Sequence, residues 1–99
     1  RPVLIGRSPS ADRVARDQLP RLLTVPSPSH DISRTHVRVT PEGWDITVTD
    51  EYSTNGTVLV RPGGEPERER LNPGEAVKVQ LGQILDLGDG VTIRIEPPT

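Results

Sequence analysis

The stretch Trp44-Asp-Ile-Thr-Val-Thr49 alternates large apolar side chains with polar ones at every second residue. A β-strand turns successive side chains to opposite faces, so this alternation predicts a strand with Trp44, Ile46 and Val48 on the core. No window of the chain keeps a helical period for more than three turns. The sequence therefore predicts an all-β fold.

Short runs of the same kind lie on both sides of this stretch and are separated by turn residues. Strands are expected at residues 3–5, 21–25, 37–40, 44–49, 58–60, 76–79, 84–87 and 91–95. Turns are expected at Pro41-Glu-Gly43 and Asn72-Pro-Gly-Glu75, while the charged segment 61–70 carries Pro and Gly and interrupts the pattern. Gly88-Asp-Gly90 predicts a type I′ hairpin turn. These eight runs and the turn residues between them indicate a total of nine or ten short strands.

The 99 residues suffice for one domain with one core, which must be mainly aliphatic because Trp44 and Tyr52 are the only aromatic residues. The absence of cysteine excludes a disulfide framework, a thiolate nucleophile and a cysteine-bound zinc. It is compatible with the cytoplasm, where we expect this protein. No signal peptide or membrane span is visible, and Arg1 together with the Pro97-Pro98 ending suggests a piece of a longer polypeptide.

The net charge of −2 is divided unevenly along the chain. Residues 1–40 carry a net charge of +4 and residues 41–99 a net charge of −6. A general nucleic-acid binder needs a basic face that displaces the counterions of phosphate, so the pI of about 5.6 argues against that class. A local anion site in the amino-terminal part remains compatible with the charge.

Three short motifs collect hydrogen-bond donors that suit a phosphoryl group or a peptide. They are Gly6-Arg7, Ser33-Arg-Thr-His36 and Ser53-Thr-Asn-Gly56. Hydroxyl, guanidinium and amide groups can all donate to phosphoryl or carbonyl oxygens. Because these donors come without an arranged nucleophile, the motifs indicate binding and no turnover.

In this order, the motifs resemble the forkhead-associated (FHA) domain, a module that binds phosphothreonine peptides, and the resemblance runs from Gly6 to about Ile95. It implies a two-sheet β-sandwich of about ten to eleven short strands, with the binding site on loops at one end. It also implies no cofactor, a phosphothreonine-containing partner and an upstream Ser/Thr protein kinase. Neither nucleic acid nor a membrane is an expected partner.

The resemblance also implies roles for individual residues. The residues expected to contact the phosphopeptide are Arg7, Ser33, Arg34, Thr54 and Asn55, with Arg34 open between a phosphate contact and an exposed charge. Those expected to support the site are Gly6, His36, Ser53 and Gly56. Asp50 and Ser53 are expected to cap their loop with hydrogen bonds from side chain to backbone.

Two departures from the family pattern bear on specificity. Twenty-five residues lie between Arg7 and Ser33, so the segment 8–20 is interpreted as an inserted surface loop. Asp31 stands near the place where some family members carry a basic residue that selects an acidic side chain in the ligand. At that place Asp31 would disfavour acidic ligands and prefer basic or neutral ones.

The same residues include types that occur in hydrolases and in metal sites. Asp31, Ser33 and His36 include the residue types of a hydrolase triad, but six residues of extended chain cannot orient them as one. His30, Asp31 and His36 match no known metal-ligand spacing. The serious alternative is an FHA-like module that binds its partner without phosphorylation.

Overall fold

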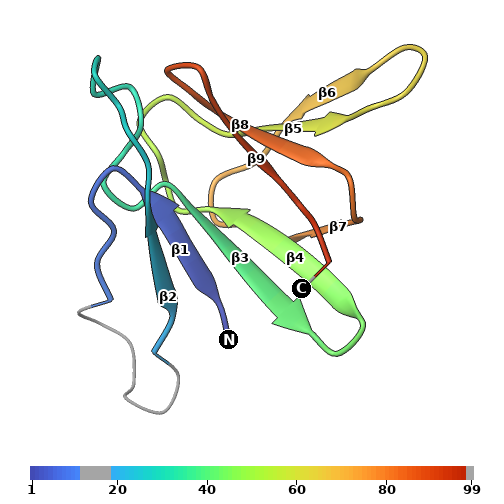
Figure 1. Ribbon diagram of the computed structural model, residues 1–99, viewed down its shortest axis with the longest axis horizontal. Helices are drawn as coiled ribbons and strands as arrows, with labels where there is room; N and C mark the ends of the chain where they lie inside the picture. Colours follow the sequence, from blue (N-terminus) through green and yellow to red (C-terminus); the bar gives the residue numbers. More distant parts are fainter. Residues whose placement is uncertain (12–18, 98–99) are drawn as a thin grey trace.

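The computed structural model describes residues 1–11 and 19–97 of the chain, and these residues form two β-sheets (Figure 1). The strands are β1 (Val3–Gly6), β2 (Arg21–Thr24), β3 (Val37–Glu42), β4 (Asp45–Asp50), β5 (Val58–Arg61), β6 (Glu67–Arg70), β7 (Val77–Val79), β8 (Ile84–Gly88) and β9 (Val91–Arg94). The all-β prediction is confirmed, with nine strands in the described residues where the family resemblance implied ten to eleven. No helix in this part of the chain is long and apolar enough to cross a membrane.

The first sheet has the order β2-β1-β3-β4-β7 and the second the order β6-β5-β8-β9. Among the strands of the described residues, only the β1–β2 pair is parallel, and every other pair is antiparallel. One aliphatic core joins the two sheets, and it includes Ile5, Val37 and Val48 from the first sheet and Leu59 and Leu85 from the second. Burial of such side chains drives the packing of the sandwich.

Trp44 does not lie in the core, which corrects the interpretation of the opening stretch. Strand β3 extends to Glu42 and β4 begins at Asp45, so Gly43 and Trp44 form the turn between them. Gly43 has a φ of 63°, which glycine adopts at no steric cost. The Trp44 side chain is fully exposed at this turn. The turn therefore consists of residues 43 and 44, whereas it was expected at 41–43.

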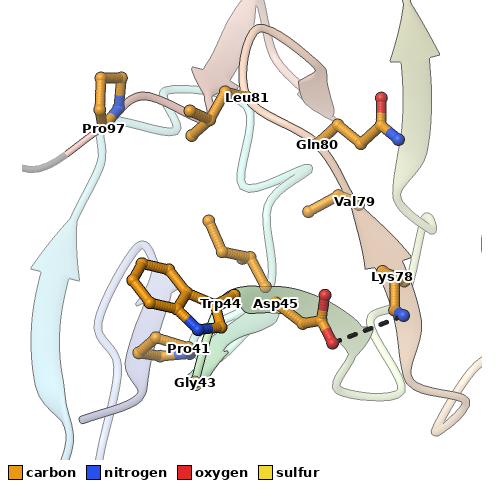
Figure 2. A pocket seen from close by; sticks show the side chains of 10 residues that line it. Pro41, Gly43, Trp44, Asp45, Lys78, Val79, Gln80, Leu81 and Pro97 are labelled. Atoms are coloured by element: carbon orange, nitrogen blue, oxygen red, sulfur yellow. Dashed lines mark ion pairs between the residues drawn. The ribbon is translucent and has the colours of Figure 1, made fainter.

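The side chain of Trp44 borders an open pocket of about 650 Å³, together with Pro41, Leu81 and Pro97 (Figure 2). An ion pair between Lys78 Nζ and Asp45 Oδ2, at 3.5 Å, lies at one side of it. The pocket is at the β3–β4 hairpin, whereas the predicted binding motifs lie at the opposite ends of these two strands. It is therefore separate from the expected site.

Strand β6 was missed by the sequence analysis, which treated the charged segment 61–70 as an interruption. Its residues Glu67–Arg70 are all exposed, because β6 is the edge strand of the second sheet. Ion pairs replace apolar contacts here: Arg61 Nη2 lies 2.7 Å from Glu69 Oε1 and Arg68 Nη2 lies 2.9 Å from Asp86 Oδ2. An edge strand covered by charges shows no apolar alternation.

Two other predicted turns are present in the structure. Asp89 and Gly90 have φ values of 56° and 75°, as the type I′ turn between β8 and β9 requires. The turn at 72–75 is closed by a hydrogen bond from Glu75 N to Asn72 O, at 3.2 Å. Most of the expected surface loop at 8–20, residues 12–18, lies outside the described residues.

Candidate functional site

The three predicted motifs meet at one end of the first sheet. Ile5 pairs with Val37, and Val37 pairs with Asp50, so the end of β1, the beginning of β3 and the end of β4 are neighbours. The loops that contain residues 31–36 and 50–57 leave from these positions. The fold therefore brings together segments that are far apart in the sequence.

Gly6 allows the end of β1 to approach the backbone of the 31–36 loop. Arg7 N donates to Ser33 O at 3.1 Å, and Ser8 N donates to Arg34 O at 3.2 Å. A Cβ atom at Gly6 would lie 2.6 Å from the carbonyl carbon of Arg34 and 2.8 Å from Ser33 O, distances that no side chain can occupy. Gly6 is thus required by close packing of two backbones.

Arg7 is half-buried and is fixed to the same loop by its side chain. Its Nε donates to Ile32 O at 3.0 Å, and neither terminal nitrogen of the guanidinium has a partner among the described residues. The Ile32 side chain is completely buried in the core, which anchors the loop directly beside Ser33. Arg7 therefore offers two oriented donor groups on a fixed stem.

Ser33 connects the 31–36 loop to the 50–57 loop. Thr54 N donates to Ser33 Oγ at 2.9 Å, and the two side-chain hydroxyl oxygens lie 3.5 Å apart. Asn55 Nδ2 donates to Asp31 O at 2.9 Å, which forms a second link. The predicted ligand-binding residues Ser33, Thr54 and Asn55 are thereby held against one another.

His36 is completely buried and braces both loops. Ser33 N donates to its Nδ1 at 3.0 Å, and its Nε2 lies 2.9 Å from Gly56 O. Because Nδ1 accepts, the imidazole hydrogen is on Nε2 and is donated to the Gly56 carbonyl. Both nitrogens are occupied by backbone groups, so His36 does not activate the Ser33 hydroxyl as a triad base would.

The 50–57 loop is organised around the carboxylate of Asp50, which is buried. Its Oδ2 accepts from Ser53 N at 3.1 Å, and its Oδ1 accepts from Ser53 Oγ at 2.5 Å and from Thr57 Oγ1 at 2.7 Å. Ser53 Oγ in turn accepts from Gly56 N at 3.0 Å. The expected capping bonds of Asp50 and Ser53 are present, whereas the buried partner Thr57 was missed.

Asp89, at the β8–β9 turn, is a further support that the sequence analysis missed. Its Oδ2 accepts from Ser27 Oγ at 2.6 Å and from Ser29 N at 3.1 Å. Ser27 Oγ also accepts from Ile32 N at 3.0 Å. The hairpin of the second sheet thus holds the loop of the first sheet that carries Ser33, through Ser27 and Ile32.

These contacts give Asp89 a role that depends on pH. The hydrogen bond from the Ser27 side chain, followed by bonds from the backbone and side chain of Ser29 and the backbone of Asp31, lowers the pKa of Asp89 below its ordinary 3.8. A carboxylate whose pKa is lowered by folding stabilises the fold above 3.8, and this contribution is lost as pH falls through the lowered value.

We therefore expect Asp89→Asn to lower the urea midpoint of unfolding near neutral pH. Well below pH 3.8, the difference in urea midpoint between the variant and the unchanged protein should become smaller. Urea denaturation at the two pH values measures this. Ser27→Ala removes the largest cause of the shift, so in that background the effect of Asp89→Asn should be smaller. A gap that is the same at both pH values would contradict the role of the Asp89 charge.

The two remaining predicted residues, Arg34 and Asp31, have exposed side chains at the edge of the site. The Arg34 guanidinium has no hydrogen-bond or ion-pair partner within residues 1–11 and 19–97, so the geometry leaves both of its predicted roles open. No group of His, Asp and Glu that could hold a metal ion occurs in the described part of the chain.

Comparison with known proteins identifies the family. A family model described as FHA domain matches residues 3–88, which is most of the chain. A comparison with curated proteins gave no match. The chain therefore belongs to the FHA domain family, which consists of protein-interaction modules that bind phosphorylated peptides or proteins and is not an enzyme family.

Proposed function

We propose that this domain binds protein segments phosphorylated on threonine and so recruits the protein that carries it to a partner modified by a Ser/Thr protein kinase. The observation that supports this most directly is the convergence of Arg7, Ser33 and Thr54, which are fixed to one another through the backbones of two loops. A phosphate group between them would meet donors that are already oriented.

The chemistry of these groups fits a phosphate monoester. Phosphothreonine carries a charge of roughly −1.5 to −2 and three strong acceptor oxygens. The terminal nitrogens of Arg7 supply charge and a forked pair of donors, while the hydroxyls of Ser33 and Thr54 are further donors. Arg34, exposed beside Ser33, adds a second cation in this proposal.

Asn55 is proposed to bind the peptide backbone next to the phosphothreonine. Its Nδ2 is already used by Asp31 O, which fixes the plane of the amide. Nδ2 has a second hydrogen and Oδ1 has free acceptor capacity, so the amide can still donate to a peptide carbonyl and accept from a peptide N–H. The ligand would then be held by its backbone as well as by its phosphate.

The preference for threonine, the upstream kinase and a cytoplasmic location belong to the same proposal. The threonine preference comes from the family, which accommodates the γ-methyl group in a small pocket. The cytoplasm fits a chain without cysteine. The pI of about 5.6 supports a protein partner over nucleic acid.

The test is a comparison of three peptides of one sequence that carry phosphothreonine, phosphoserine or plain threonine. Isothermal titration calorimetry should give the tightest binding for phosphothreonine and much weaker binding for the other two. A degenerate phosphothreonine library then identifies the preferred flanking residues. Equal affinity for the phosphorylated and plain peptides would instead support an interaction module that does not depend on phosphorylation, and release of phosphate would indicate an enzyme.

A further inference from the structure

Arg70, the last residue of β6, lies against the loop that carries Thr54 and Asn55. It pairs with Val58 at the start of β5, immediately after the 50–57 loop. Gly56 has a φ of 88°, and a Cβ atom at Gly56 would lie 2.6 Å from Arg70 Nη2 and 2.7 Å from its Cζ. The guanidinium therefore covers the backbone directly after Asn55.

The charge of Arg70 is not neutralised by a neighbour, in contrast to the other arginines of this strand pair. Arg61 is paired with Glu69 and Arg68 with Asp86. Arg70 is exposed and has no hydrogen bond or ion pair to any residue in the described ranges. A guanidinium in this state is available to a ligand anion.

The charges around the proposed peptide path differ at its two sides. On one side of Asn55 lie two carboxylates. Asp31 belongs to the loop that Asn55 contacts, and Asp89 belongs to the β8–β9 hairpin, which contacts Ser27. Arg70 lies on the Gly56 side. The loop with Asp31 also carries the exposed Arg34, so the charges on the first side are mixed, whereas Arg70 on the second side is paired with no carboxylate of the described residues. An anionic side chain of the ligand would therefore be attracted on the Gly56 side.

We infer that Arg70 is a specificity-determining residue, which selects phosphopeptides with a second anionic group within about three residues of the phosphothreonine. Gly56, which Arg70 covers, is only two residues from Thr54 at the proposed phosphate site. An extended ligand advances about 3.3 Å per residue, so it spans this short distance within about three residues of the phosphothreonine. The anion is a carboxylate or a second phosphate, since a guanidinium binds both in the same way. The inference rests on the proposed function.

Isothermal titration calorimetry with a set of phosphothreonine peptides tests this inference. In an alanine background, one glutamate or one phosphoserine is placed in turn at each position from three before to three after the phosphothreonine. We expect one position at which the anionic peptide binds about two- to fivefold more tightly than the alanine peptide, which is the range for an exposed ion pair. The ratio should fall to about one in Arg70→Gln. The preference between glutamate and phosphoserine identifies the source of the anion.

Arg61→Gln is the matched control, because it removes the same charge from the same strand pair three residues from Val58 and should leave the ratio as it was. Arg70→Glu should reverse the preference in favour of a lysine at that position. If Arg70→Gln weakens all peptides by the same factor, Arg70 only supports the loop and the inference fails while phosphopeptide binding stands. The inference about Arg70 also fails, and phosphopeptide binding also stands, if no position in the peptide favours an anionic residue over alanine. If the unchanged protein binds plain and phosphorylated peptides equally, the proposed function fails, and the inference with it.

Discussion

Replacing Arg7 by alanine is expected to weaken binding of a phosphothreonine peptide by about ten- to a hundredfold, the effect of removing one charge-assisted hydrogen-bonding group. The reason is that Arg7 supplies the only guanidinium held at the site by a hydrogen bond to the described loops, from its Nε to Ile32 O. Isothermal titration calorimetry of the unchanged and altered proteins measures the loss. Ser33→Ala should weaken the same binding for the related reason that it removes a donor.

Two controls separate ligand contact from loop support. Arg7→Lys retains the charge but loses the fork, so its affinity should lie between those of the unchanged protein and Arg7→Ala. Arg94→Ala removes an exposed arginine from β9 and should change the affinity little. If Arg7→Ala weakens plain and phosphorylated peptides equally, or if Arg94→Ala has the same effect, Arg7 does not contact the phosphate.

Asp50→Ala is expected to lower the free energy of unfolding by about 2–4 kcal/mol, because it leaves several polar groups without their acceptor. Thr57, whose hydroxyl donates to Asp50 Oδ1, is completely buried and has no access to water as a substitute. Ser53 loses the acceptor of both its N–H and its hydroxyl. Urea denaturation measures the change.

The control for this prediction is Asp45→Ala at the start of the same strand. Asp45 is exposed and its only ion pair among the described residues is the one with Lys78, so the loss should stay within about 1 kcal/mol. Asp50→Asn keeps one acceptor oxygen and should fall between the two alanine variants. Equal losses for Asp45→Ala and Asp50→Ala would show that the buried hydrogen bonds of Asp50 contribute no more than a surface charge.

The loop around Asp50 could be predicted from the sequence because its contacts are local. Asp50 and Ser53 are three residues apart, a spacing at which a short polar side chain reaches the backbone of its own loop. Asp89 could not be predicted in this way. Its partner Ser27 is 62 residues away, and only the packing of the two sheets brings the hairpin to the loop.

The two errors in the strand predictions also have physical reasons. Trp44 follows the alternation of β4, but a two-residue turn with Gly43 takes it out of the strand, and alternation alone does not mark that boundary. Strand β6 has no apolar face to detect, since its neighbours are charged side chains and solvent. The strands that bury one face, such as β8 and β9, were placed correctly.

The hydrogen bonds that hold the site also determine when it exists during folding. Asn55 bonds to Asp31 across 24 positions and Ser27 to Asp89 across 62, so the site needs both sheets to be assembled. A chain whose second sheet is still open lacks the support that Asp89 gives, through Ser27, to the loop that carries Ser33. Ligand and fold must therefore stabilise each other, since a peptide that binds only the assembled site withdraws molecules from unfolding. Occupancy by the ligand would thus report that folding is complete.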